Sequence, residues 1–208
     1  MPPSYPVTFS VDYPERKLNR LTTFFRIFTV IPIAIVSGLL PGGEVATQLN
    51  GSGSGIAITL ASFVFGPIVL MLLFRKKYPR WWFDWNLELM RFGNRLSAYL
   101  ALMDDEYPST DEQQAVHLDF AYPDAGRLER ALPLVKWFLA IPHYIVLFFL
   151  YIGAFFAVIF AWFAILFTGR YPRGIFKFVE GTLRWQNRVI AYALVLVTDA
   201  YPPFRLSA

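Results

Sequence analysis

Tyr78–Arg95 reads YPRWWFDWNLELMRFGNR, and Tyr171–Arg188 reads YPRGIFKFVEGTLRWQNR. Both stretches open with Tyr-Pro-Arg, continue with aromatic residues and close with Asn-Arg. Their matching residues keep the same order along the chain, which indicates an internal repeat rather than chance. The fold is therefore expected to contain one unit twice.

The repeat extends in both directions from these stretches. VTFSVDYP, from Val7, aligns with VHLDFAYP, from Val116, and one Ile-Pro pair in each following apolar segment coincides. Each match closes at an Asp-x-Tyr-Pro sequence. These limits predict two membrane repeats, residues 1–108 and 109–208, each made of a strand, two apolar segments and a long helix.

The composition favours a membrane protein. Hydrophobic residues make up 56% of the 208 residues and aromatic residues 18%, and the mean hydropathy is +0.43, more apolar material than a soluble domain of this size can bury. The N-terminal sequence lacks the basic start and apolar core of a signal peptide. No cysteine is present, so disulfides and thiolate metal sites are excluded.

Four apolar segments are candidates for membrane-spanning helices, since a crossing needs about 20 residues. The expected spans are 18–40, 56–74, 128–150 and 152–168. They form two helical hairpins whose tips lie at 41–55 and 151–153. A proline inside the first span of each copy predicts a kinked arm.

The basic residues orient these hairpins. All 19 lysines and arginines lie outside the two tips, so they share one side of the membrane if each copy crosses twice. The positive-inside rule makes that side, with both termini, cytoplasmic. An alternative stays open, in which 18–31 and 127–141 lie in the membrane interface and one helix per copy crosses.

The third segment of each copy predicts a long amphipathic interfacial helix, at 80–103 and 173–198. Its charged residues share one narrow stripe, and the remaining surface is apolar. The arginines either reach lipid phosphates or form ion pairs between the copies. The expected lipid-headgroup or inter-repeat contacts are Arg91, Asn94, Arg95, Tyr99, Arg184, Asn187, Arg188 and Tyr192.

Three extended pieces surround these helices. YPVTFSVDYP, AVHLDFAYP and YPPFRL alternate apolar and polar residues, as half-buried strands do, and predict a small cytoplasmic β element. The linker DDEYPSTDEQQ has five acidic residues and no basic one. It is interpreted as a solvated hinge, or as a contact for a basic partner.

The sequence contains no recognisable catalytic or metal motif. Its two histidines, His117 and His143, have no metal-ligand spacing, and GSGSG at 51–55 fits neither a nucleophile elbow nor a phosphate loop. Basic residues lie beside the spans rather than on a free polar domain, which disfavours nucleic acid. No catalytic residue, metal or cofactor is expected.

The second half resembles a known family. LVKWFLAIPHYIVLFFL, WFAILFTGRYPRGIFKFVEGTLRW and RVIAYALVLVTDAYPPFRL are similar to the hallmark stretches of a bacterial membrane family called domain of unknown function 4389. The first copy follows the same plan less closely. The resemblance implies a bacterial integral membrane protein, and it supplies no activity or catalytic residue. Combined with the predicted spans, the expectation is a mainly α integral membrane protein of the bacterial cytoplasmic (inner) membrane.

These observations lead to two functional hypotheses from different classes. The first is a non-enzymatic accessory or scaffold subunit of a membrane protein complex, in contact with lipids and protein partners. The second is a binding or carrier protein for an anionic lipid or small amphiphile, which would use the two arginine-striped helices. An enzyme acting on a membrane lipid is a third, weaker hypothesis, with Glu88 or Glu180 as its base.

Overall fold

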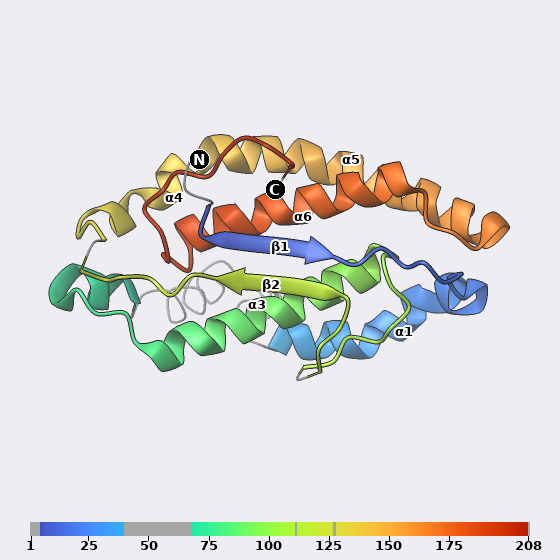
Figure 1. The fold of residues 1–208 in the computed structure, drawn as a ribbon, viewed down its shortest axis with the longest axis horizontal. Helices are drawn as coiled ribbons and strands as arrows, with labels where there is room; N and C mark the ends of the chain where they lie inside the picture. The colour runs from blue at the N-terminus through green and yellow to red at the C-terminus, as the bar shows by residue number, and fades with distance from the viewer. Residues whose placement is uncertain (1–4, 40–67, 111, 127, 208) are drawn as a thin grey trace, which may run out of the picture.

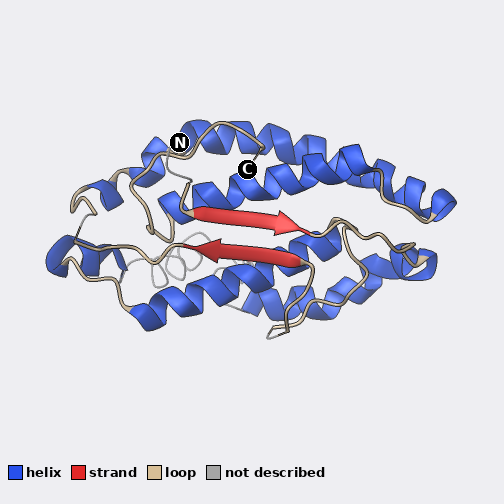
Figure 2. Cartoon of the chain, viewed as in Figure 1, coloured by secondary structure: helices blue, strands red, loops and turns tan. Residues whose placement is uncertain are grey.

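The computed structural model describes residues 5–39, 68–110, 112–126 and 128–207. The molecule is long and flat, and its helices run along the long axis with a pair of strands across one broad face (Figure 1). The described part is mainly helical with a small two-stranded sheet, which confirms the expected helical content and the small β element (Figure 2).

The two strands are β1 (Val7–Val11) and β2 (Val116–Phe120), one from each half of the chain. They pair antiparallel with Phe9 opposite Leu118. Both strands bury every second residue, which confirms the predicted alternation. The third expected strand is absent, because YPPFRL from Tyr201 forms no ladder and instead runs beside α6 (Figure 1).

The helices under the sheet are α3 (Arg80–Leu100) and α6 (Arg173–Ala193). Each helix begins directly after a Tyr-Pro pair. This position is expected because the residue before a proline favours an extended backbone and ends any preceding helix. Strand β2 packs on α3 and β1 packs on α6, so each strand lies on the long helix of the other half. Both helices end a few residues before the expected limits of 103 and 198.

The largest correction concerns the second half. Residues 151–153 form no hairpin tip, because α5 (Ile141–Thr168) is one continuous helix through them. The segment contains no polar residue that would favour a turn, and Gly153 instead lets α5 approach Phe178 of α6 closely. The expected spans 128–150 and 152–168 are thus replaced by a single apolar helix.

Residues 128–140, expected to belong to one span, do not form a continuous helix before α5. They include a 3-10 turn, η2 (Leu132–Leu134), and one turn of helix, α4 (Lys136–Leu139). Pro142 lies in the first turn of α5, where its missing N–H costs nothing. It therefore starts a helix instead of kinking one.

In the first half, α1 (Arg20–Leu39) occupies most of the expected span 18–40 and has Pro32 in its interior. The first tip, 41–55, lies outside the described residues, as does most of the span 56–74. The described end of that span is helical and finishes in a π-helical turn, η1 (Met71–Arg75). Helix α1 packs on α3 and α5, and α5 packs on α6. The sheet, the α3–α6 pair and the outer helices therefore form three layers.

In each half, a buried cation before the Ile-Pro pair contacts the segment that follows a long helix. Arg26 of α1 pairs with Asp105 at 2.5 Å, and Lys136 of α4 pairs with Asp199 at 2.6 Å. Arg26 also donates to the carbonyl oxygen of Asp104, and Lys136 to that of Thr198. The two sites have the same design, a buried cation between a carboxylate and a backbone carbonyl.

Replacing Lys136 with Met should destabilise the protein by about 3 kcal/mol, because the Asp199 carboxylate loses its buried partner. Thermal unfolding in detergent measures the effect. Lys77→Met is the matched control, since Lys77 is exposed and its loss should leave the unfolding temperature nearly unchanged. Equal unfolding temperatures for the two variants would contradict a stabilising role for the buried pair.

Candidate functional site

The eight residues predicted as polar contacts lie in three different places. The four arginines line a cleft beside the sheet, the two asparagines meet between α3 and α6, and the two tyrosines cover the buried cations. On the charged stripes of α3 and α6, Arg91 and Arg184 reach strand residues of the other half of the chain.

Arg91 and Arg184 bind the outer edges of the strand pair. The backbone N–H of Asp12 donates to Ala115 O, and that of Ala121 donates to Pro6 O. In this register the carbonyls of Phe9 and Leu118 point outward. Arg184 Nε donates to Phe9 O, and Arg91 Nε donates to Leu118 O, each at 2.9 Å. The two arginines thus occupy equivalent positions on opposite strands.

Each of these two arginines also has a carboxylate partner on its own helix. Arg91 pairs with Glu88 at 2.5 Å, and Arg184 forms a short ion pair with Glu180. The exposed carboxylate of Asp119 lies 3.5 Å from Arg91 as well. The charges of Arg91 and Arg184 are therefore balanced within the fold.

Arg95 and Arg188 donate to backbone carbonyl oxygens instead of carboxylates. Arg95 donates to Ser109 O at 2.8 Å, and Arg188 donates to Arg205 O at 3.1 Å and to Ser207 O at 2.8 Å. Only 7% of Arg95 and 2% of Arg188 is exposed, and the Nε atom of each has no hydrogen-bond partner. Within the described residues, neither guanidinium has an ion pair with a carboxylate.

The surroundings of Arg188 are strongly positive. Burial lowers the pKa of its guanidinium, and the nearby charges of Arg205 and Arg184 lower it further. The hydroxyl of Tyr5 donates to the backbone oxygen of Arg188 at 3.4 Å. Of these three guanidiniums only that of Arg184 is paired with a carboxylate among the described residues, that of Glu180, and the imbalance favours an anion.

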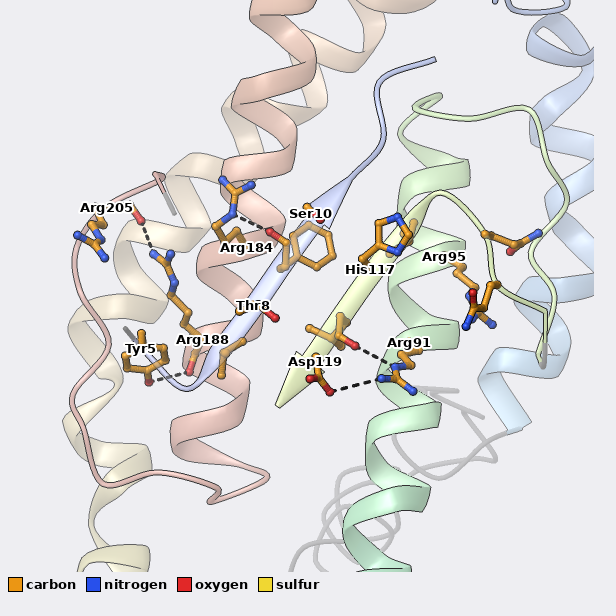
Figure 3. A pocket seen from close by; sticks show the side chains of 16 residues that line it. Tyr5, Thr8, Ser10, Arg91, Arg95, His117, Asp119, Arg184, Arg188 and Arg205 are labelled. Carbon is orange, nitrogen blue, oxygen red and sulfur yellow. Dashed lines mark hydrogen bonds and ion pairs between the residues drawn. The ribbon is translucent and has the colours of Figure 1, made fainter. Parts of the chain in front are cut away.

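These residues surround a half-open cleft of about 540 Å³ that follows the two strands (Figure 3). Arg184, Arg188 and Arg205 lie beside β1, whereas Arg91 and Arg95 lie beside β2. The lining also includes strand side chains and two linker glutamines. A volume of this size suits a small ligand or a short segment of a partner.

Arg205 and Tyr5 were not predicted as site residues. Both lie near a chain end, in segments interpreted only as strands, and the sequence gives no sign that the two ends meet beside α6. The buried cations Arg26 and Lys136 were also missed. Their signal was present, because both precede the Ile-Pro pair by the same number of residues.

The asparagines form a reciprocal pair. The Nδ2 atom of Asn94 donates to Oδ1 of Asn187 at 2.8 Å, and Nδ2 of Asn187 donates to Oδ1 of Asn94 at 2.7 Å. Each amide also donates to the carbonyl one turn earlier in its helix. The pair is buried and fully bonded, so its role is to fix α3 against α6.

The tyrosines complete the buried cation sites. The ring of Tyr99 lies 4.2 Å from the Arg26 guanidinium carbon, and that of Tyr192 lies 5.2 Å from Lys136 Nζ. These distances permit cation–π attraction. Tyr99 and Tyr192 therefore stabilise the fold and do not line the cleft.

The histidines have structural surroundings. His143 is fully buried, accepts a hydrogen bond from Trp185 Nε1 at 3.0 Å and stacks on Phe204. His117 lies on the outer face of the sheet, 2.9 Å from the Asp12 carboxylate. Among the described residues, no group of three or more His, Cys, Asp or Glu side chains could hold a metal ion.

Residues 132–205 match the family model described as Domain of unknown function (DUF4389), which confirms the resemblance found in the sequence. The match covers α4, α5, α6 and Arg205, and thus the Arg184–Arg188–Arg205 side of the cleft. No curated protein and no solved structure matches the chain.

Replacing Asn94 with Leu should destabilise the protein by about 2 kcal/mol, because it leaves the buried Asn187 amide without its partner. The double variant Asn94→Leu/Asn187→Leu should recover most of that loss, since no polar group is then stranded. A double-mutant cycle of unfolding temperatures measures the coupling. Additive losses would show that the two amides act independently.

Proposed function

We propose that the protein is a membrane-anchored, non-enzymatic accessory subunit that binds an anionic group of a partner protein in the arginine cleft. The proposal combines an apolar exterior with a positively charged cleft. Each part rests on its own observations, and each has its own test.

The apolar exterior supports membrane anchoring. One helix of the described part, α5, is long and apolar enough to cross a membrane. It buries only a narrow stripe against α6, while large side chains such as Phe148, Phe155 and Phe160 are more than half exposed. Apolar surface of this extent on a protein marks a membrane or protein interface. The family resemblance favours a bacterial membrane.

The buried guanidinium of Arg188 carries the anion-binding part. Arg188 lies against Arg205 and Arg184, has no carboxylate partner among the described residues and retains an unpartnered Nε. An uncompensated buried charge is costly. An anion in the cleft would supply the missing partner through charge-assisted hydrogen bonds. Carboxylates of an acidic protein segment provide this chemistry.

An accessory role fits the cleft better than catalysis. Glu88 and Glu180, the carboxylates expected to act as a base in an enzyme, are each engaged by an arginine. A general base needs a free lone pair directed at the substrate. Neither glutamate lines the cleft, and the two titratable side chains of the strands that do line it, His117 and Asp119, lie against Asp12 and Arg91.

A lipid or amphiphile ligand is the second candidate. The cleft contains apolar side chains, Val7 and Leu118 among them, beside its arginines. Such a mixture suits a molecule with an anionic head and an apolar tail. The same arginines would bind a phosphate in place of a carboxylate.

We further propose that the chain is a tandem duplication. Arg91 and Arg184 each bind the central carbonyl of one strand, and Arg26 and Lys136 each lie beneath a tyrosine and beside an aspartate. These contacts use residues at matching places in the two aligned copies. Related halves around one sheet make two equivalent sides of the cleft.

The first prediction from this proposal concerns membrane anchoring. The protein should stay in the membrane fraction through high-salt and alkaline carbonate washes and leave it only with detergent, because its apolar surface and not its charge holds it there. Fractionation followed by immunoblotting measures this. Release by salt alone would refute the anchor.

The second prediction concerns the cleft. Full-length protein in nanodiscs of neutral lipid should bind a hexaglutamate peptide, and Arg188→Gln/Arg205→Gln should weaken binding about tenfold or more through the loss of charge-assisted contacts. Arg130→Gln/Arg170→Gln removes the same charge at exposed positions outside the cleft and should leave affinity nearly unchanged. Circular dichroism checks that both variants fold.

A second arm separates the two ligand classes. If soluble short-chain phosphatidylglycerol binds in an Arg188-dependent way and the peptide does not, the lipid candidate replaces the accessory role. If neither probe binds the unmodified protein, anion binding by the cleft is refuted.

A further inference from the structure

The way α5 lies against the rest of the protein bears on how it can sit in a membrane. Helix α5 does not project from the domain, because it packs along α6 for much of its length. Near the start of α5, His143 bonds Trp185, and further along Gly153 faces Phe178. The two helices therefore run antiparallel and side by side (Figure 1).

The sheet lies alongside the same stretch. Arg184, in the middle of α6, binds the central residue of β1, and Trp185 beside it binds His143. The sheet is consequently level with the first half of α5. At 1.5 Å per residue α5 is about 42 Å long, so an upright α5 would extend beyond a hydrocarbon core of about 30 Å.

An upright α5 would carry the sheet into that core. The outer face of the strands exposes Thr8, Ser10, His117 and Asp119, and in the described part no further strand pairs with either edge. Polar side chains and open strand edges in contact with lipid are not tolerated at this depth. The sheet needs water on its outer face.

The basic residues give an independent argument. Arg170 and Arg173 follow the end of α5, and Arg20 donates to Phe167 O there. At the other end, exposed Arg130 precedes α4. Since α5 is continuous, a crossing would place these bases on opposite sides of the membrane, against the usual one-sided distribution.

We propose that α5 lies in the plane of the membrane, embedded with α1 in one leaflet of an anionic bilayer, while the sheet and the arginine cleft face water. This placement rests on the membrane anchoring proposed above and adds its geometry. The exposed aromatic faces of α1 and α5, including Phe28 and Phe149, enter the acyl region. The basic groups at both ends of α5 then meet anionic headgroups of the same leaflet.

The orientation also defines which ligand reaches the cleft. A cleft that opens to water beside the sheet is accessible to a soluble acidic segment. A lipid could enter it only after leaving the bilayer. The in-plane arrangement therefore favours a partner that approaches from the aqueous side.

Cysteine accessibility tests this placement, and the chain is suited to it because it has no cysteine. Arg130→Cys and Arg170→Cys put a thiol at an exposed position near each end of α5, Ser10→Cys puts one on the outer face of the sheet, and Ile152→Cys puts one in the middle of α5. A membrane-impermeant maleimide is applied to sealed vesicles of both orientations, which contain anionic lipid.

The in-plane helix gives labelling of the first three positions from one side only and no labelling of Ile152→Cys from either side. Labelling of Arg130→Cys and Arg170→Cys from opposite sides would overturn the proposal and establish a crossing. Labelling of Ile152→Cys from the side opposite the ends would overturn it in favour of a hairpin. Release of the protein from the vesicles by salt would instead refute the membrane anchor itself.

A second measurement needs no variant. The helices run along one molecular axis, so polarised infrared spectra of the unmodified protein in aligned bilayers report its tilt. In-plane helices give an amide I dichroic ratio below the isotropic value, and a crossing α5 gives a ratio above it. The higher ratio would overturn the proposal even if the cysteine variants failed to fold.

Discussion

The antiparallel pairing of β1 with β2 is the constraint on which the rest of the structure depends. Two strands of five residues are too short to be stable in water without further support. They obtain it from α3 and α6, and each strand lies on the helix contributed by the opposite half of the chain. The two sequence units therefore share one core, and neither buries its own strand.

The exchange of strands explains where the charges lie. Antiparallel pairing turns the carbonyls of Phe9 and Leu118 outward, and these carbonyls need donors. Arg184 and Arg91 supply them, with carboxylates nearby that balance their charge. The next arginine on the same face, one turn along each helix, donates to loop or C-terminal carbonyls instead of a strand carbonyl, and has no carboxylate partner among the described residues.

The outer layer follows a different rule. Helices α1 and α5 meet the middle layer through narrow stripes, with small residues such as Ala154 and Ala161 where α5 is most buried. Among the described residues, both helices expose large aromatic and aliphatic side chains on their other faces. The sheet runs beside α5 and not beyond its end. The polar surface of the sheet and the apolar surface of α5 therefore both extend along the long axis of the protein. This arrangement connects the membrane placement with the direction in which the cleft opens.

The two strands, the starts of α3 and α6 and the inward-facing residues of the sheet could be predicted from the sequence, because Tyr-Pro pairs and strict alternation act locally. Local patterns also identified Arg91, Arg95, Arg184 and Arg188. They could not show that Arg205 joins Arg188, since that contact depends on where the chain end runs.

The wrong hairpin at 151–153 has a similar cause. The length of the apolar run and the distribution of basic residues predicted a tip there, whereas the contact of Gly153 with Phe178 makes it a place of close helix packing. By itself, then, the sequence determined the elements, the apolar composition and the repeated polar residues, through short-range backbone preferences and periodicity. Only the tertiary structure decided that α5 is continuous and that the stripes face the sheet, because both depend on contacts between residues far apart in the chain.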